Sequence, residues 1–233
     1  MGIDRARLPA RHELKYYINP AELEALKRRL LATMRLDAHC RGGRPYNVRS
    51  LYFDDAFDSA YFDKVDGVAA RDKYRLRIYN GDGEVIFLER KRKLGDLIEK
   101  HSLRVTRRLA DRLIAGDPRG LQRAEAPLLR EMYAAMRLGA LRPAALVEYD
   151  RLAFVHPAET TRVTFDMRLR AAVTGLDLFS PGVMLRPADE ATEILEIKFD
   201  SCFPAHIRAL LAGMTAQRCA ISKYVMCRRF ENL

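Results

Sequence analysis

The chain has 233 residues, 48% of them apolar, and a formal net charge of +10. This length accommodates one large domain or two small ones, and the apolar fraction is sufficient for a substantial core. The charge favours an anionic partner, such as a nucleic acid, an anionic membrane or a phosphate-rich small molecule, without choosing among them.

The cysteine spacing, the N-terminal sequence and the lengths of the apolar runs argue against a zinc protein, a secreted protein and a membrane-spanning protein. The four cysteines have neither CxxC nor zinc-site spacing, which predicts reduced, structural thiols: Cys40, Cys202, Cys219 and Cys227. The N-terminus lacks the apolar core of a signal peptide, and no apolar run approaches the roughly 18 residues of a spanning helix. We therefore expect a cytoplasmic protein without a transmembrane segment.

The first half of the chain alternates strands with short helices. Asn19 and Pro20 form an N-cap and first helical residue, and Glu22 completes a capping box, so a helix is expected to follow the first strand. The sequence Asn80-Gly81-Asp82-Gly83 predicts a hairpin turn. The expected strands cover residues 11–18, 46–54, 72–79, 84–93 and 99–108, and a short helix or loop covers 58–67.

The second half begins with a helical pattern over residues 109–141, interrupted early by Gly116-Asp117-Pro118. Strands are expected at 145–154, 161–170 and 193–200, with a long loop over 176–192 between the last two. A helix is expected over 204–213, and residues 220–228 are expected to form a strand or a short helix. No internal repeat or linker is present, so we expect a single domain over residues 1–233.

Charged residues alternate with apolar residues along most of these strands. Successive side chains of a strand point to opposite faces, so Lys73, Arg75 and Arg77 share one face and Tyr74 and Leu76 share the other. Adjacent cations repel one another unless an anion or carboxylates lie between them. The same mixture of Glu, Lys and Arg recurs on later strands. The pattern favours an α+β fold, with a closed antiparallel barrel around a charged lumen and helices packed outside.

Several other polar residues on these strands are expected to be structural and not part of a site. Arg90 and Arg92 are expected to face outward, and Arg49 fits either face. Tyr52, Asp54 and Tyr149 are expected to pack or to form hydrogen bonds. The alternatives for the basic strand faces are a solvated surface and cross-strand ion pairs.

Eight short motifs occur in one order along nearly the whole chain. They are HELKY (12–16), YNVRSLYFD (46–54), KYRLRIY (73–79), FLERKRK (87–93), VEYDRLAF (147–154), RVTFD (162–166), LEIKFD (195–200) and SKY (222–224). With these motifs the chain resembles the VTC domain, the polyphosphate-polymerase-like branch of the triphosphate tunnel metalloenzymes.

The resemblance implies a tunnel of about eight antiparallel strands that binds a nucleoside triphosphate or polyphosphate with Mn²⁺ or Mg²⁺. The residues assigned to phosphoryl transfer are Arg75, Arg77, Lys91 and Lys198. The residues assigned to substrate binding are Lys15, Lys73, Lys100, Arg151, Ser222 and Lys223. The carboxylate assigned most firmly to the metal is Glu196, with Glu89 and Glu13 as further acidic candidates.

The chemistry of these residues fits the assignment. Phosphoryl transfer depends mainly on positioning and charge stabilisation, which Arg and Lys provide, and a hard divalent cation takes carboxylate and phosphate oxygens. We expect polyphosphate synthesis from ATP. The alternatives are a triphosphate hydrolase and a non-catalytic polyphosphate-binding module. Nucleic acid is not expected, apart from an RNA 5′-triphosphate end, and a membrane-protein partner stays open.

Overall fold

The computed structural model describes residues 4–95, 97–156, 160–189, 193–200, 203–216 and 218–228, with side chains from His12 onward. The strands are β1 (Asp4–Ile18), β2 (Arg35–Leu36), β3 (Tyr46–Asp54), β4 (Ala70–Tyr79), β5 (Asp82–Leu94), β6 (Leu97–Val105), β7 (Arg142–Val155), β8 (Arg162–Ala172), β9 (Leu185–Pro187) and β10 (Glu193–Phe199). The helices are α1 (Pro20–Leu31), α2 (Ser59–Val65), α3 (Arg107–Ile114), α4 (Pro127–Leu138), α5 (Ala205–Leu210) and α6 (Lys223–Arg228).

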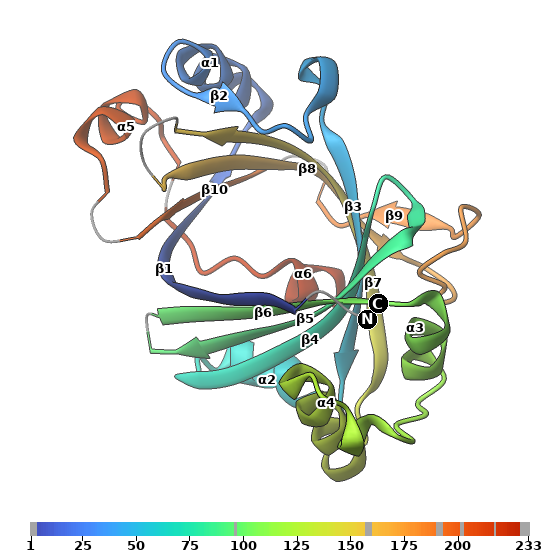
Figure 1. Cartoon of the computed structure of the whole chain (residues 1–233). Coiled ribbons are helices and arrows are strands. Elements are labelled where there is room, and N and C mark those ends of the chain that lie inside the picture. The colour runs from blue at the N-terminus through green and yellow to red at the C-terminus, as the bar shows by residue number, and fades with distance from the viewer. Residues whose placement is uncertain are drawn as a thin grey trace.

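The long strands surround one interior (Figure 1). The sheet has the order β2-β7-β3-β4-β5-β6-β1-β10-β8-β9, and β7 also pairs with β8. Successive antiparallel pairings therefore lead around eight strands, from β7 through β3 and β1 to β8. The pairing of β1 with β6 is the most irregular, because register shifts separate its few partners. This arrangement confirms the predicted antiparallel tunnel of about eight strands with helices outside.

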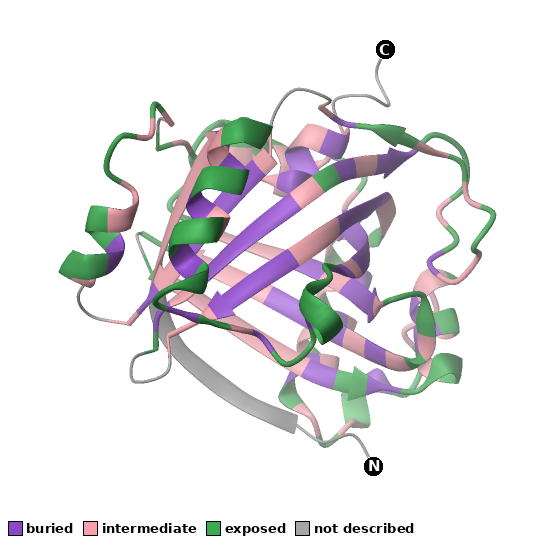
Figure 2. Cartoon of the chain, turned by 90° about the horizontal axis from the view of Figure 1, so that it is seen from above, coloured by how far each residue is buried: buried purple, intermediate pink, exposed green. Residues whose placement is uncertain are grey.

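Two apolar clusters attach the helices to the barrel. Leu23, Leu26 and Leu30 of α1 belong to the same cluster as Phe154 and Phe165 of β7 and β8. The other cluster joins α3 and α4 to the strands β3, β4 and β5, through residues such as Leu113, Met132, Leu76 and Leu88. Figure 2 shows that buried and half-buried residues dominate the strands, while exposed residues gather on helices and loops. Because the apolar side chains point outward against the helices, the polar face of each strand lines the interior.

Local signals account for several element boundaries. Asn19 caps α1, because its side chain accepts a hydrogen bond from Glu22 N (2.9 Å) while Glu22 Oε2 accepts one from Asn19 N (3.1 Å). Asn80 and Gly81 both have positive φ, which the tight turn between β4 and β5 requires. Both features were predicted, and strand 46–54 has the bounds expected.

Other elements differ from the expectation in their bounds or were not expected. The strand expected over 99–108 ends at Val105, because the Thr106 side chain accepts a hydrogen bond from Leu109 N and caps α3. The pattern over 109–141 gives α3, a 3-10 helix (Leu121–Arg123) and α4. The loop expected over 176–192 contains β9, and the short strand β2 was missed.

Among the described residues, no helix is long and apolar enough to cross a membrane. Cys202 lies outside the described residues.

The segment 218–228, which includes α6, crosses the interior between strands that are far apart around the barrel. Figure 1 shows α6 between β8 and β10 on one side and β4, β5 and β6 on the other. Its entry is fixed by a bridge between Tyr16 and Arg218 and by a hydrogen bond from Cys219 N to Lys15 O (2.9 Å). Residues 220–228 were expected as a strand or a short helix, and they contain the helix α6.

Candidate tunnel site

Glu13 of β1 lies at the centre of one group of lysines. Its carboxylate lies 2.7 Å from Lys91 Nζ, 3.6 Å from Lys198 Nζ and 3.9 Å from Lys15 Nζ. Burial raises the pKa of this carboxyl, but the three lysines outweigh burial and hold the pKa well below its usual value. Glu13 is therefore an anion at neutral pH, bonded to cations from β5, β10 and its own strand.

Glu196 of β10 lies beside Glu13 because of the strand register. Lys15 is opposite Glu196, and Glu13 is opposite Lys198. Lys198 Nζ consequently reaches both carboxylates, at 2.5 Å from Glu196 and 3.6 Å from Glu13. Arg151 approaches Glu196 from β7 at 3.9 Å. The structure thus brings together two of the three predicted metal carboxylates with the predicted cations around them.

The pair Glu13 and Glu196 fits a small divalent cation. Glu13 Oε1 is buried and accepts no hydrogen bond, so one carboxylate oxygen in the interior has only distant lysine charges as partners. Mg²⁺ and Mn²⁺ are commonly held by one or two carboxylates together with substrate phosphates and waters. No group of three acidic, histidine or cysteine ligands occurs among the described residues, so waters or substrate oxygens would complete the coordination of such an ion.

Glu89 of β5 organises a separate group of cations. Its carboxylate lies 2.7 Å from Arg75, 2.5 Å from Lys100 and 3.8 Å from Arg77. Burial raises its pKa, but Lys100, Arg75 and Arg77 together hold the pKa well below the usual value. The Glu89 side chain is only 2% exposed. Glu89 therefore lies among cations of β4 and β6, and its contacts differ from those of Glu13 and Glu196.

Asp166 of β8 is a member of the site to which the sequence analysis assigned no role. It accepts two hydrogen bonds from Arg151 (2.6 and 2.7 Å), and Lys223 Nζ of α6 lies 2.6 Å away. Burial raises its pKa, but Arg151 and Lys223 together hold it far below the usual value. The signal was present in the sequence, because Asp166 ends the motif RVTFD on the polar face of its strand.

Tyr149 of β7 connects the two groups of cations. Its hydroxyl oxygen accepts hydrogen bonds from Arg77 and Arg151, both at 3.2 Å. Burial raises the pKa of this phenol, but the neighbouring Arg151 and Arg77 outweigh burial and lower it to about 8. Tyr149 was expected to pack or to form hydrogen bonds, and it does both. Through it, Arg77 beside Glu89 is joined to Arg151 beside Glu196.

The last predicted binding residues belong to the segment 218–228 and to β4. Lys73 Nζ donates to Ser222 Oγ (3.1 Å), and Lys15 Nζ donates to Ile221 O (3.2 Å). Burial, reinforced by nearby cations, lowers the pKa of Lys73 to about 7. Burial also lowers the pKa values of Lys100 and Lys198, each to about 8. Every predicted site residue therefore lies in one connected interior, although their roles in chemistry stay predictions.

The residues expected to have structural roles lie on both faces of the sheet. Asp54, on the same face of β3 as Ser50 and Tyr52, accepts hydrogen bonds from Ala60 N (2.9 Å) and Tyr61 N (3.1 Å) at the start of α2, so it has the structural role expected. Arg90 was expected to face outward. It does point away from the lumen, but its side chain is only 4% exposed, because α4 covers it and supplies Glu131 at 2.5 Å. Arg49 also lies on the outer face, where it donates to Glu148 (2.6 Å).

A family model, described as the VTC domain, matches residues 10–231. The chain belongs to the VTC domain family. This membership confirms the resemblance carried by the eight motifs. For this VTC protein, a comparison with curated proteins found no match.

Several solved structures are similar to this VTC domain at low identity, and the one with a TM-score of 0.58 shares its fold. A putative adenylyl cyclase from Hippeastrum, described as having a dominant triphosphatase activity, has a TM-score of 0.58 and 14% identity, covering 96% of this chain and 97% of its own. A putative adenylate cyclase from Bacillus halodurans has a TM-score of 0.49 and 12% identity, covering 83% and 82%. The PH1819 protein from Pyrococcus horikoshii has a TM-score of 0.48 and 12% identity, covering 93% and 97%.

Proposed function

We propose that this protein binds a triphosphate or polyphosphate chain in its tunnel and transfers the terminal phosphoryl group. The observation that carries the proposal is one interior in which eight cationic side chains contact four carboxylates and a ninth, Lys73, lies beside them. The cations are Lys15, Lys73, Arg75, Arg77, Lys91, Lys100, Arg151, Lys198 and Lys223, and the carboxylates are Glu13, Glu89, Asp166 and Glu196. The excess of positive charge favours a ligand with several negative charges over one with a single charge.

The arginines and lysines have different tasks in this proposal. A guanidinium group contacts two phosphate oxygens in a fixed geometry, whereas an ammonium group acts as a compact charge with rotatable donors. Arg75 and Arg77 are held by Glu89 and Tyr149, so they are positioned before any ligand arrives. Lys91 and Lys198 lie beside the carboxylates where the terminal phosphate is proposed to react. Positioning and charge stabilisation of this kind supply most of the catalysis of phosphoryl transfer.

The proposed metal site is the pair Glu13 and Glu196, with Mg²⁺ or Mn²⁺ as the ion. When bound, the ion would neutralise charge on the phosphate oxygens. Two observations support this pair over Glu89. Glu13 Oε1 accepts no hydrogen bond, and Lys198 contacts both Glu13 and Glu196, which places these two carboxylates side by side. Lys198 would keep the two carboxylates close until an ion takes its place.

We further propose that the acceptor is another phosphate, so that ATP is converted into polyphosphate in the cytoplasm. VTC family membership supports this acceptor. Hydrolysis is the second candidate, and the description of the Hippeastrum structure as a triphosphatase supports it. A binding module without turnover is the third. One experiment separates them: incubation of the pure protein with ATP and Mn²⁺ or Mg²⁺, followed by a gel that resolves polyphosphate. A ladder of products supports synthesis, phosphate alone supports hydrolysis, and no turnover refutes the enzymatic proposal.

The metal assignment is tested by Glu196→Gln, which keeps the size of the side chain and removes its charge. We expect at least roughly a hundredfold loss of metal-dependent turnover, while tripolyphosphate binding persists or tightens because a negative charge leaves the interior. The matched control is Glu193→Gln on the same strand, where Glu193 accepts a hydrogen bond from Arg168 N outside the site. Wild-type turnover with unchanged metal dependence in Glu196→Gln would show that the assignment is wrong.

A further inference from the structure

Four cations form a group at the end of the tunnel where β4 begins and β5 ends. The mouth cluster, as we call it, consists of Lys64, Arg71, Lys73 and Lys93. Arg71 is directly opposite Lys93, and Lys73 is directly opposite Lys91. Alternation along β4 places Arg71 and Lys73 on the same face as Arg75. The mouth cluster thus continues the cationic row of the tunnel toward its edge.

The mouth cluster differs from the interior because no carboxylate of the described part of the chain lies within ion-pair distance of it. Among the described residues, none of its members forms an ion pair, and their hydrogen-bond partners are neutral oxygens. Lys64 Nζ donates to Ala220 O (2.8 Å) and Lys73 Nζ donates to Ser222 Oγ (3.1 Å). Arg71 donates to Val68 O and Lys93 donates to Gly95 O. Asp63 attracts Arg71 more weakly, without a contact of ion-pair length.

This arrangement is unfavourable in the absence of an anion. Side chains directly opposite each other in an antiparallel pair are about 5 Å apart at Cβ, and like charges there destabilise the sheet. All four side chains are half-buried, so solvent screens them incompletely. Burial and the charges of Arg71 and Lys93 lower the pKa of Lys64, so these groups act on one another.

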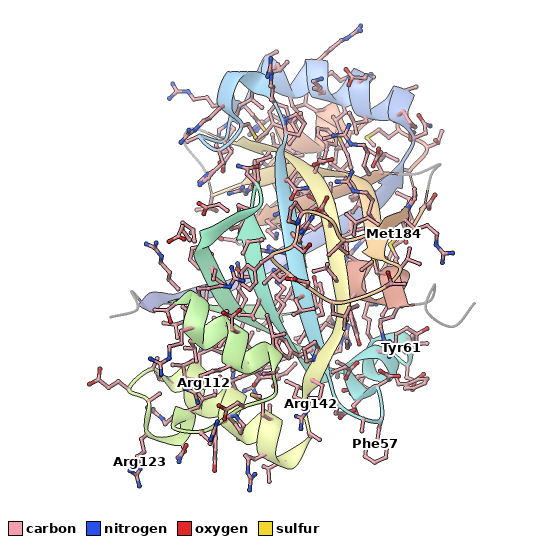
Figure 3. All side chains as sticks on the ribbon, turned by 90° about the vertical axis from the view of Figure 1, so that its right-hand side faces the viewer. Phe57, Tyr61, Arg112, Arg123, Arg142 and Met184 are labelled. Carbon is pink, nitrogen blue, oxygen red and sulfur yellow. The ribbon has the colours of Figure 1, made fainter. Side chains whose placement is uncertain are left out.

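The donors needed to bind an anion are available. An ammonium group has three N–H donors, and the structure uses one of them at Lys64 and one at Lys73. These two lysines belong to different elements, Lys64 to α2 and Lys73 to β4. Figure 3 shows α2, marked by Tyr61, directly beside α6, so the segment 218–228 borders the mouth cluster. Two more cations, Arg71 and Lys93, lie on the adjacent strands.

We propose that the mouth cluster binds the phosphates of a long polyphosphate chain where the chain leaves the tunnel. This inference rests on the proposed function and deepens it, because it adds a binding site for those phosphates of a long chain that lie beyond the reach of the interior cations. From Arg77 to Arg71 the strand advances six residues, about 20 Å at roughly 3.3 Å per residue. That span is longer than an extended tripolyphosphate. A short ligand held by Arg75, Arg77 and Lys91 therefore reaches no farther than Lys73 and leaves Lys64, Arg71 and Lys93 without a partner, whereas a long chain reaches all four.

The test compares chain lengths in a double variant, Arg71→Ala with Lys93→Ala. Affinities of the pure protein for tripolyphosphate and for long-chain polyphosphate are measured by calorimetry. We expect the double variant to bind long-chain polyphosphate about tenfold more weakly, which is about 1.4 kcal/mol, and tripolyphosphate within about twofold of the wild type. Its affinity for the long chain should also depend less steeply on salt. The control, Lys27→Ala with Arg28→Ala on the outer helix α1, removes the same charge and should change neither affinity.

Unchanged tripolyphosphate binding shows that the double variant is folded, so the outcomes separate the two proposals. Equal losses for both ligands, or no loss for either, would overturn the mouth cluster and leave the tunnel proposal in place. A wild type that binds neither ligand would overturn both. A single-stranded RNA of matched charge that binds the wild type more tightly than polyphosphate, and is weakened by the double variant, would identify the mouth cluster as a nucleic-acid site and overturn this assignment.

Discussion

Glu89→Gln tests the electrostatic balance of the tunnel most directly. The substitution keeps the shape of a side chain that is 2% exposed and removes the anion shared by Arg75, Lys100 and Arg77. Breaking a buried ion pair from one side typically costs about 3–5 kcal/mol, because the partner charge stays buried without compensation. Lys100 is one-third exposed and water can solvate it. We therefore expect a loss of about 3 kcal/mol in the free energy of unfolding.

Tripolyphosphate should restore part of this stability. At a ligand concentration of about 100 times Kd, binding to the folded state alone contributes about 2.7 kcal/mol to any variant. The variant gains more than the wild type at the same concentration, because phosphate replaces the missing carboxylate. Each tenfold tightening adds about 1.4 kcal/mol. The measurement is urea denaturation of both proteins with and without tripolyphosphate.

Glu131→Gln is the matched control for this prediction. Glu131 of α4 is the partner of Arg90, another buried arginine, but on the outer face of the same strand as Glu89. Its loss should destabilise the protein, and tripolyphosphate should stabilise this variant no more than it stabilises the wild type. The reasoning is refuted if Glu89→Gln costs less than about 1 kcal/mol, or if tripolyphosphate stabilises both variants equally.

Two further predictions concern pH and the first helix. Because its pKa is lowered to about 7, Lys73 is cationic below that pH and neutral above it. Tripolyphosphate affinity should therefore fall severalfold from about pH 6 to about pH 8 relative to Lys73→Arg, and parallel calorimetric profiles would contradict this. The groups facing Lys73 are Lys91, Lys64, Asp54, Arg71, Ser222 and Tyr224. Asn19→Ala should cost about 1 kcal/mol of unfolding free energy without changing tripolyphosphate affinity, and a change in affinity would count against a purely local cap.

The face of each strand could be predicted from the sequence because side-chain direction is a local property. Lys73, Arg75 and Arg77 point into the interior as alternation requires, and Asn19 begins α1 because capping depends on four neighbouring residues. The turn at Asn80 was equally local. Strand faces and turns of this kind were enough to indicate the architecture.

The pairing of charges could not be predicted, because it depends on register between strands distant in sequence. Lys91 is bonded to Glu13, 78 residues away, and Asp166 is bonded to Lys223. Neither contact follows from the pattern of a single strand. The burial of Arg90 depends in the same way on where α4 packs. The position of α6 inside the barrel was also outside the reach of local patterns, since its residues fit a strand as well as a helix.

The four carboxylates explain how a buried group of cations stays charged. Burial disfavours the ammonium form, and Lys73, without a carboxylate in contact, has its pKa lowered to about 7. Burial lowers the pKa values of Lys100 and Lys198 to about 8, while Glu89 acts to raise the first and Glu13 the second. The carboxylates thus favour the protonated lysines that an anion needs. A phosphate chain in the tunnel can replace Glu89 and Glu196 as the partner of these lysines. Binding then exchanges carboxylate oxygens for phosphate oxygens, and the phosphate oxygens favour the protonated lysines in the same way.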